Sequence, residues 1–583
     1  MPTLEWIGKE KVVNHHLEVP YRVLERKYSF DENGQTEADN GSENMIIHGD
    51  NLEALKSLLP QYEGRVKCIY IDPPYNTGNE GWVYNDNVND PHIKAWLNKT
   101  VGKEGEDLSR HDKWLCMMYP RLKLLQKLLS EDGAIFISID DTEYANLKLI
   151  CDEIFGSNCF VSNISWQRTY STRNDSKGIV NEVEHIVVYS KQPDWNPNKL
   201  PRTAEMDAKY KNPDNDRTLW RTDNAFAPGA ATHQGMVYAI QHPFTGKMLY
   251  PANGRCWTFG QDQMLEIMRG WCSYELRDLN DSHERAVVCG VPESDVRQGV
   301  QAIVLSEPLE VSKQKAQAVY DRGQWPRFFF TKGGKGGIAR KTYLENVGGK
   351  LPTNFWPFSE TGHTDEAKKE MLAIFDGKAT FDTPKPHRLI EFVLKVAGSK
   401  DSLILDSFAG SGTTAHAVLN MNKADGGNRK FILVEMGDYA DSITAERVKR
   451  VIHGYGEGKN AVEGTGGNFS FYELGEPLMV GDVLNENVGI DKIREYVYFT
   501  DTKTPLPESC PEEPYLMGVH VNSAYYFYYE KQSVTTLNRQ FLHTVKTKAD
   551  AYVIYADLCT LGEAELEKYH ITFKKIPRDI TKL

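Results

Sequence analysis

The chain has 583 residues, of which 40% are hydrophobic and 26% are charged, and its formal net charge is −13. This length exceeds what one hydrophobic core supports, and the ordinary balance of apolar and charged residues excludes extensive disorder. The net negative charge argues mildly against a nucleic-acid binder as a whole, although an average hides local patches.

No stretch approaches the roughly 18 apolar residues of a membrane helix, and the amino terminus lacks the apolar stretch of a signal peptide. The nine cysteines are scattered without a C-x-x-C pair, which indicates reduced thiols and no metal site. We therefore expect a cytoplasmic protein with no membrane partner.

The first 44 residues are expected to form an N-terminal extension. It ends in DENGQTEADNGSEN at 31–44, a polar and acidic run that is typical of a linker or long loop. The first lobe of a core is predicted to follow at 45–190, and it opens with a short strand at 45–48. Asp50 comes directly after that strand, where it would make an ordinary N-cap for a helix.

A second strand is predicted at 66–71, where the run VKCIYI would be buried and would carry Asp72 into a crevice at its carboxyl end. Pro73 and Pro74 restrict the backbone, so the Asp72 carboxylate and the Pro73 carbonyl form a rigid pair of acceptors. Such a pair suits an aromatic amine, because bonding both hydrogens localises the nitrogen lone pair toward an electrophile, while Tyr75 stacks on the ring. The alternative is a proline-stiffened turn with an Asp cap and a core Tyr.

The remainder of the first lobe also has the pattern of an α/β fold. Residues 114–129 predict an amphipathic helix and 133–139 a buried strand, and 163–170 and 184–191 are typical of antiparallel edge strands. From 191 to 351 the pattern changes to long polar loops and short irregular strands. This change predicts an inserted α+β domain.

Within the insertion, residues 313–350 carry the opposite charge to the whole chain. They include nine basic and two acidic residues, a net charge of +7, with aromatic residues between them. Such a stretch suits contact with nucleic-acid phosphates, and a solvated basic loop on a structural hairpin is the alternative. The candidate nucleic-acid-binding residues are Arg327 and Arg340, as base readers, and Lys332, Lys335 and Lys341.

The second lobe of the core is predicted at 352–475. A helix from about His387 leads to a strand at 402–405, and Asp406 follows that strand. The run FAGSG comes next and turns into an apolar helix from about Thr413.

The two glycines of this turn are candidates for ligand binding. Gly410 and Gly412 let the backbone bend sharply and approach a ligand closely, and the helix start offers free N–H groups. The next strand, at 430–434, ends in Glu435, and an acid in that place holds ribose hydroxyls in nucleotide-binding α/β folds. A glycine turn that only starts a helix is the alternative.

Together these motifs resemble those of S-adenosylmethionine-dependent amino methyltransferases that act on DNA. In that family a D-P-P-Y loop holds the target amine and an F-x-G-x-G loop holds the cofactor, and the order found here resembles the circularly permuted β class. The runs IHGDNLEAL, WLCMMYPRLKLLQKLLSEDGAIFISIDD, DEIFG and TPKPHRLIEFVL resemble the modification (Mod) subunits of type III restriction-modification systems and their solitary relatives. This similarity spans roughly 45–190 and 352–440.

The resemblance implies a Rossmann-like α/β methyltransferase core formed by 45–190 and 352–475. Residues 191–351 would then be an inserted α+β target-recognition domain, and 476–583 a C-terminal mixed region without an assigned function. A homodimer is the expected assembly.

The resemblance also assigns roles within the site. Asp72 and the Pro73 carbonyl would accept the hydrogens of the adenine amino group, and Tyr75 would stack on the flipped base. Lys385 would hold the carboxylate of S-adenosyl-L-methionine, with a solvated lysine in a turn as the alternative. The implied catalytic residues are Asp72, Pro73, Pro74 and Tyr75, and the implied cofactor-binding residues are Phe408, Gly410, Gly412, Asp406, Glu435, Lys385 and Asp50.

The function implied by the resemblance is a site-specific transfer of a methyl group to N6 of adenine in double-stranded DNA after base flipping. An Asp at the start of the D-P-P-Y loop fits adenine, whereas Ser tends to mark cytosine N4. Methylation of cytosine N4 or of an RNA base, and a non-catalytic DNA-binding subunit, remain alternatives. Cytosine C5 chemistry is disfavoured because no Pro-Cys dipeptide occurs. GGKGGIARKT lacks the Walker pattern, so cleavage would need a separate ATP-hydrolysing restriction subunit as partner.

Overall fold

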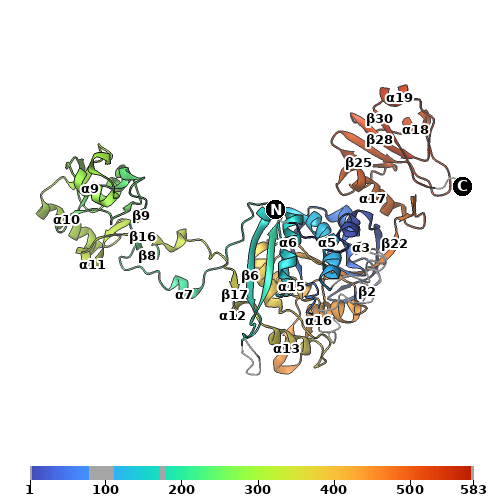
Figure 1. The fold of residues 1–583 in the computed structure, drawn as a ribbon, viewed down its shortest axis with the longest axis horizontal. Helices are drawn as coiled ribbons and strands as arrows, with labels where there is room; N and C mark the ends of the chain where they lie inside the picture. The colour runs from blue at the N-terminus through green and yellow to red at the C-terminus, as the bar shows by residue number, and fades with distance from the viewer. Residues whose placement is uncertain (1–2, 78–109, 171–178, 579–583) are drawn as a thin grey trace. The chain divides into compact units, whose positions relative to one another are not determined.

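The computed structural model describes residues 3–77, 110–170 and 179–578. The chain divides into two compact units, one formed by Met1–Asn198 with Pro352–Leu583 and the other by Lys199–Leu351 (Figure 1). The second unit corresponds closely to the insertion predicted at 191–351. The first lobe predicted at 45–190 includes 78–109 and 171–178, which lie outside the described residues. In the described part of the chain, no helix combines the length and the apolar composition needed to cross a bilayer.

The larger unit is built on one mixed sheet. Among the described residues its strand order is β17-β6-β7-β5-β4-β18-β19-β3-β22-β1-β2. The six strands from β5 to β22 run parallel, and their apolar sequences reflect burial on both faces. Every strand predicted for this region is present. The six strands are β5 (Leu129–Ile139), β4 (Val66–Ile71), β18 (Leu403–Asp406), β19 (Lys430–Glu435), β3 (Met45–His48) and β22 (Phe469–Pro477).

At one side of the sheet, β7 (Val183–Ser190) and β6 (Phe160–Gln167) are antiparallel, as the sequence predicts. The sheet continues one strand further, because β17 (Phe355–Trp356) pairs in parallel outside β6. The outermost position at this side is therefore held by a two-residue strand from the second lobe.

At the other side, the N-terminal extension adds two strands to the sheet, and the second of them lies within the run 31–44 that is predicted as a linker or long loop. Its strand β1 (Arg22–Asp31) pairs with β22, and β2 (Gly34–Thr36) pairs with β1 through a tight turn. The rings of Tyr28 and Phe471 stack with their centroids 5.2 Å apart. The alternating aromatic residues of β1 thus form a buried face. The polar residues that follow β1 in the sequence gave no indication of it.

Helices cover both faces of the sheet, which is the doubly wound, Rossmann-like α/β arrangement that the sequence predicts. On one face α3 (Asn51–Tyr62), α5 (Arg110–Leu128) and α6 (Tyr144–Phe155) share one hydrophobic core with Ile69, Ile135 and Ile432. On the other face Phe136 contacts Trp356, which in turn contacts Phe392 of α14. The helices of that second layer are α14 (His387–Ala397), α15 (Thr413–Asp425) and α16 (Glu446–His453).

The inserted unit mixes short strands with helices, as the sequence predicts, and has its own aromatic core that includes Trp220, Trp257 and Trp271. One of its sheets has the order β15-β16-β8. At its two ends Leu200 and Lys350 exchange backbone hydrogen bonds, each 2.8 Å long. The strands of that sheet are β15 (Phe328–Phe330), β16 (Ile338–Tyr343) and β8 (Trp220–Asn224).

The C-terminal region that follows β22 contains a four-stranded sheet of order β25-β26-β28-β30 and the helix α17 (Ile490–Thr502). Its mixture of helix and strand agrees with the sequence-based expectation. The strands are β25 (Leu516–His520), β26 (Ser523–Phe527), β28 (Ala551–Ala556) and β30 (Ile571–Lys575).

Candidate active site

The two loops predicted to form the site follow neighbouring parallel strands. In the pairing of β4 with β18, Cys68 lies opposite Ile404 and Ile69 opposite Leu405. The acidic loop (72–76) and the glycine loop (406–412) therefore leave the same edge of the sheet side by side. β19 and β3 continue the same parallel arrangement, so Glu435 and then Asp50 follow along this edge.

At the acidic loop, Lys385 contacts both oxygens of Asp72. The Lys385 ammonium lies 2.9 Å from Oδ1 and 2.8 Å from Oδ2, and it also donates to the Tyr75 hydroxyl at 2.8 Å. Only 9% of the Lys385 side chain is exposed, so the alternative of a solvated lysine is wrong. The contact of Lys385 with the cofactor's carboxylate stays a prediction, since the ammonium contacts Asp72 in this structure.

Two residues that the sequence did not single out complete this cluster. Glu184 on β7 lies 3.6 Å from the Lys385 ammonium, and its Oε2 lies 3.2 Å from the Tyr75 hydroxyl. The guanidinium of Arg168 donates to Glu184 Oε1 at 2.7 Å. The cluster thus holds two carboxylates and two cations, which compensate each other in a buried place.

Burial and charge act against each other in this cluster. Burial raises the pKa of Asp72, and the neighbouring Lys385 offsets only part of that effect. Burial would also raise the pKa of Glu184, but the positive charges of Lys385 and Arg168 outweigh it and lower that pKa. Burial lowers the pKa of Lys385, yet the two carboxylates prevail and raise it. The surroundings therefore favour the charged forms of Lys385 and Glu184, whereas burial disfavours the charged form of Asp72.

The aromatic ring of Tyr75 is buried, and the Lys385 ammonium lies 4.9 Å from its centroid. Its hydroxyl lies 2.9 Å from Asp72 Oδ1. Burial and the nearby carboxylates raise the pKa of Tyr75 well above its usual range, so the phenol is neutral. Stacking on a base stays a prediction.

The acidic loop is supported from behind by side chains of the first lobe. The indole N–H of Trp114 donates to the Pro74 carbonyl at 2.7 Å. Asn76 has a positive φ of 60°, and its amide donates to the buried carboxylate of Glu143. Glu143 also lies 2.6 Å from His111 Nδ1. These contacts hold the loop's backbone rigidly where the prolines alone would fix only two angles.

The glycine loop leaves no room for side chains at its two predicted glycines. Gly410 has a φ of 51°, and a Cβ there would lie 3.1 Å from the ring of Phe381. Gly412 has a φ of 81°, and a Cβ there would lie 3.0 Å from the carbonyl oxygen of Thr444. Both positions lie in the left-handed region that favours glycine.

Asp406 shapes this loop from within. Its Oδ1 accepts from the Phe408 backbone N–H at 3.0 Å, and its Oδ2 accepts from the Thr414 hydroxyl at 2.6 Å. Burial raises the pKa of Asp406 to about 7. Phe408 is half-buried and packs against the core beneath the loop. Cofactor contacts of these two residues stay predictions.

Glu435 joins the glycine loop to the next strand end. One carboxylate oxygen accepts from the Gly410 backbone N–H at 2.7 Å, and the other accepts from the Gly437 N–H at 2.9 Å. Burial raises the pKa of Glu435 to about 8, although these backbone hydrogen bonds partly offset the rise. The carboxylate is thus aimed at the glycine loop, where the predicted ribose would lie.

Asp50 forms the N-cap of α3. Its Oδ1 accepts from the backbone N–H groups of Leu52, at 2.8 Å, and Glu53, at 3.3 Å. The capping role that the sequence offered as an alternative is therefore present. Oδ2 lies 3.6 Å from the guanidinium of Arg121.

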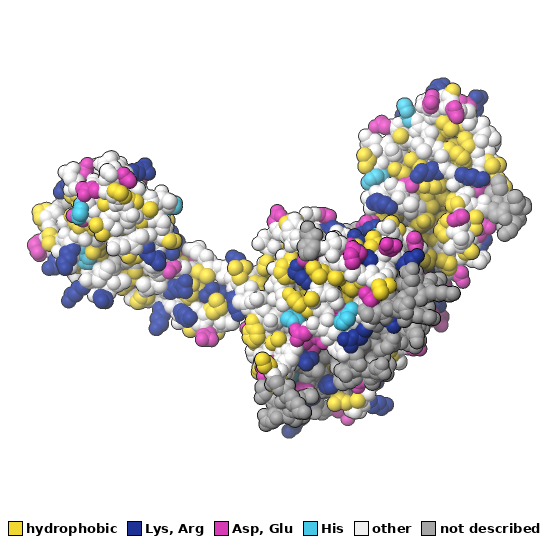
Figure 2. Space-filling model, in the orientation of Figure 1, with side chains coloured by type: hydrophobic (Ala, Val, Ile, Leu, Met, Phe, Trp, Pro, Cys, Tyr) yellow, Lys and Arg dark blue, Asp and Glu magenta, His cyan; other side chains and the backbone are white. Residues whose placement is uncertain are grey.

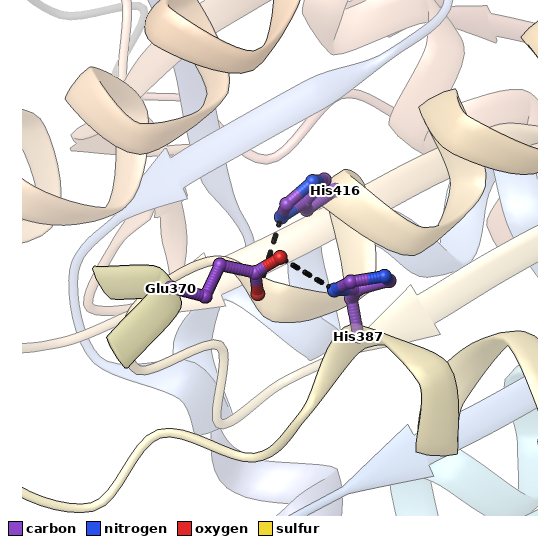
Figure 3. Close-up of side chains that lie close together, drawn as sticks. All are labelled: Glu370, His387 and His416. Atoms are coloured by element: carbon purple, nitrogen blue, oxygen red, sulfur yellow. Dashed lines mark ion pairs between the residues drawn. The ribbon is translucent and has the colours of Figure 1, made fainter. Parts of the chain in front are cut away.

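Behind the glycine loop, three helices bring Glu370, His387 and His416 together (Figure 3). Glu370 lies on α13 (Thr364–Ile374), and its carboxylate is 2.7 Å from His387 Nδ1 and 3.9 Å from His416 Nδ1. Burial would raise the pKa of Glu370, but its positively charged neighbours lower it to about 2. Hydrogen bonding and attraction to Glu370 raise the pKa of His387 against the effect of burial.

Three such side chains are typical metal ligands, but Arg447 lies in the same place. Its guanidinium lies 3.2 Å from Glu370 and 3.1 Å from His416 Nδ1, and a dication would have to displace it. The same guanidinium donates to the hydroxyls of Ser411, at 2.9 Å, and Thr413, at 2.8 Å. The cluster therefore works as a polar support for the glycine loop.

In the inserted unit, the predicted basic residues differ in accessibility. Arg327, Lys332 and Lys335 are exposed. Arg340 is half-buried, and its guanidinium lies 3.1 Å from Asp223. Figure 2 shows Lys and Arg side chains gathered along one edge of this unit.

Lys341 corrects the prediction of a phosphate contact. Its side chain is completely buried, and its ammonium lies 2.5 Å from Asp214 and 2.6 Å from Asp216. The reason is the alternation of β16: the ammonium of Lys341 points into the unit, where two carboxylates neutralise it.

Glu184 and Arg447 were not predicted from the sequence, because each lies in a segment of ordinary composition. Glu184 stands in an alternating strand, where a polar residue normally faces water. Arg447 stands in a helix that also carries Lys449 and Arg450. A signal for Glu184 did exist, because it begins the predicted strand 184–191, and the start of an antiparallel strand lies at the edge where the neighbouring strand ends.

Comparison with known proteins agrees with this geometry. Residues 66–498 match the family described as DNA methylase. The Mod subunit of the StyLTI type III restriction-modification enzyme from Salmonella typhimurium is 34% identical over 440 residues, which cover 70% of this chain and 57% of that protein. The Mod subunit of the EcoPI type III enzyme from Escherichia phage P1 is 29% identical, with 74% of this chain and 63% of that protein covered.

A third relative, the type II methyltransferase M.KpnI from Klebsiella pneumoniae, is 30% identical over 411 residues, which cover 70% of this chain and 84% of that protein. The chain spans less than two thirds of the length of the two Mod subunits.

Proposed function

The chain belongs to the DNA methylase family, and on that premise we propose that it is a site-specific methyltransferase acting on N6 of adenine in duplex DNA. The observation that carries the proposal is the parallel pairing of β4 with β18. This pairing brings the acidic loop beside the glycine loop, which supports the proposal because the target amine and the cofactor would have to lie next to each other.

The residues of the glycine loop fit S-adenosyl-L-methionine. A Cβ at Gly410 or Gly412 would press on Phe381 or on the Thr444 carbonyl, so the course of this loop requires glycine, and α15 begins directly after it with free N–H groups. Glu435 is a buried carboxylate in the place where ribose hydroxyls would donate to it. Asp50 and Lys385 are assigned to the cofactor's adenine ring and carboxylate by resemblance alone.

When bound, the cofactor supplies a methyl group activated on a sulfonium. The chain's own residues place the acceptor: Asp72 and the Pro73 carbonyl accept the two hydrogens of the adenine amine and turn its lone pair toward that methyl. The bound cofactor would supply the methyl group for the new N–C bond, and Asp72, whose pKa burial raises, would accept the proton that the amine gives up. Placement along one axis can supply several kcal/mol, on the order of the effects seen for aligned intramolecular reactions.

Since the amine is enclosed in a duplex, the adenine has to leave the base stack at a cost of a few kcal/mol. Tyr75 stacking and contacts from the inserted unit would offset this cost. Arg327, Lys332 and Lys335 are the exposed basic residues assigned to phosphates and bases, with Arg340 beside them. We assign the inserted unit to target recognition because it carries this basic stretch.

Further partners follow from the relatives. Two of them are named as Mod subunits of type III restriction-modification enzymes. We propose an ATP-dependent restriction subunit as a partner, and a homodimer as the assembly of this chain.

The test is to incubate the chain with duplex DNA and labelled cofactor, digest the product to nucleosides and identify the modified one. N6-methyladenine is the expected product. N4-methylcytosine, or label in RNA alone, would contradict adenine N6 in DNA as the target. DNA binding without any transfer would instead indicate a non-catalytic DNA-binding subunit.

A further inference from the structure

Asp72 is the proposed acceptor of the target amine, yet it already has two donors. The Lys385 ammonium contacts both of its oxygens, and the Tyr75 hydroxyl lies 2.9 Å from Oδ1. A carboxylate offers about four lone-pair sites, and these three contacts occupy all but about one of them. A cation held on Asp72 also opposes the positive charge that develops on the amine as the methyl arrives.

Glu184 offers the ammonium a second position. Only 8% of its side chain is exposed, and it lies 3.6 Å from the Lys385 ammonium. Arg168 holds Oε1, whereas Oε2 is turned toward Tyr75 and Lys385. A shift of about 1 Å would bring the ammonium to hydrogen-bonding distance of this second carboxylate.

The anchoring of Lys385 allows such a shift without moving the backbone. Its carbonyl oxygen accepts from the Thr413 hydroxyl at 3.3 Å, so the residue stays tied to the start of α15. The Tyr75 hydroxyl lies between the two carboxylates and accepts from the ammonium at 2.8 Å. Lys385 therefore has a bridging partner that it keeps in either position.

We propose that Glu184 is a positioning residue: it receives the Lys385 ammonium when the target amine arrives, and it thereby frees Asp72 to accept a hydrogen of the amine. This inference rests on the proposed function, but it gives the Lys385 ammonium to Glu184 in place of the cofactor's carboxylate, to which resemblance alone assigns it. In the ligand-free chain Lys385 neutralises Asp72, and with the target base in place it neutralises Glu184. Arg168 stays on Glu184 in both states, and in the second state Asp72 keeps the Tyr75 hydroxyl as a donor and gains a hydrogen of the amine.

The test is single-turnover methylation by Glu184→Gln at saturating cofactor and DNA, in the full chain. Gln keeps the shape but removes the charge that draws the ammonium from Asp72, so the transfer rate should fall at least about tenfold. Cofactor and DNA dissociation constants should stay unchanged. Glu182→Gln, the same substitution two positions earlier on the chain, is the matched control and should transfer at the wild-type rate.

A double-mutant cycle with Lys385→Met distinguishes the proposed positioning role of Glu184 from a purely structural one. Without the ammonium there is nothing for Glu184 to receive, so adding Glu184→Gln should cost much less than it does in the wild type. Glu184→Asp, which keeps the charge, should recover part of the rate and serves as the test if the Gln variant does not fold.

An equal loss in both backgrounds, a wild-type rate in Glu184→Gln, or a Glu184→Asp rate as low as that of Glu184→Gln would overturn the inference and leave the proposed function standing. Absence of any transfer by the unmodified chain would instead remove the proposed function and, with it, this inference.

Discussion

The carbonyl oxygen of Lys385 accepts a hydrogen bond from the hydroxyl of Thr413, while the ammonium of the same lysine contacts Asp72. One residue thus ties the helix that follows the glycine loop to the carboxylate of the acidic loop. The two halves of the candidate site are therefore coupled through a side chain as well as through the pairing of β4 with β18.

Asp72→Ala should abolish methyl transfer, with a fall of at least about 100-fold, because it removes the acceptor for the amine and its proton. DNA binding should persist, since the assigned phosphate contacts lie in the inserted unit. Transfer of labelled methyl and a DNA-binding titration check this. Asp132→Ala, at an exposed carboxylate, is the control, and an Asp72→Ala variant that transfers at the wild-type rate would remove Asp72 from the mechanism.

Gly412→Ala should weaken cofactor binding, whereas Gly426→Ala should not. Both glycines have left-handed backbones, with φ of 81° and 66°, so each substitution should cost about 1–2 kcal/mol of stability. Only at Gly412 would the new Cβ press on a neighbour, the carbonyl of Thr444, and so displace the loop. Calorimetric titration with cofactor measures the difference, and equal affinities in the two variants would contradict it.

Cofactor affinity should rise with pH in the range that leads up to about 8. Burial raises the pKa of Glu435 from 4.5 to about 8, so the acid is largely protonated at pH 6 and a poorer acceptor for ribose hydroxyls. Affinity should therefore fall by up to about tenfold per unit below pH 8. Titrations from pH 6 to 9 measure this, and Glu435→Gln should remove the slope attributable to this group.

The same shift acts on stability with the opposite sign. Because the folded pKa of Glu435 lies above its unfolded value, the neutral form is favoured by the fold, and stability declines as the pH rises from 4.5 toward 8. The unfolding free energy of the wild type should therefore fall over this range relative to that of Glu435→Gln. A rise relative to Glu435→Gln would contradict the assignment.

Lys341→Met should destabilise the inserted unit by about 3–5 kcal/mol, because it leaves Asp214 and Asp216 buried without their cation. Lys313→Met, at an exposed lysine of the same unit, should have little effect. Calorimetric unfolding of the full chain measures both variants. Equal losses of stability in the two variants would indicate that Lys341 behaves as a surface charge.

Lys332→Ala and Lys335→Ala should weaken DNA binding without destabilising the unit. Each lost phosphate contact should reduce the slope of log affinity against log salt by roughly 0.9. Binding measured across a salt series provides that slope, with Lys568→Ala in the C-terminal region as the control. An unchanged slope in both variants would leave the hairpin as a solvated basic loop.

Much of the core could be predicted because its signals are local. Buried parallel strands are continuous apolar runs, and a strand end followed by Asp72-Pro73 or by a glycine turn is visible in a few residues. The neighbouring position of the two loops, which lie more than 300 residues apart in the chain, came from the resemblance and is seen directly in the register of β4 and β18.

What could not be predicted depends on which way side chains face in three dimensions. Glu184 and Lys341 both stand in alternating strands, and only the packed structure shows that each points inward to a partner of opposite charge. The pairing of β1 with β22 joins the two ends of the core, and no local pattern announces so distant a partner.

The hydrogen-bonded pair of Leu200 and Lys350 closes the inserted unit at its base, so the chain departs from the core and returns to it at adjacent points. A segment joined in this way can be exchanged as one piece. On the role proposed for the inserted unit, exchanging 199–351 for the matching segment of a relative should change the DNA sequence that is methylated.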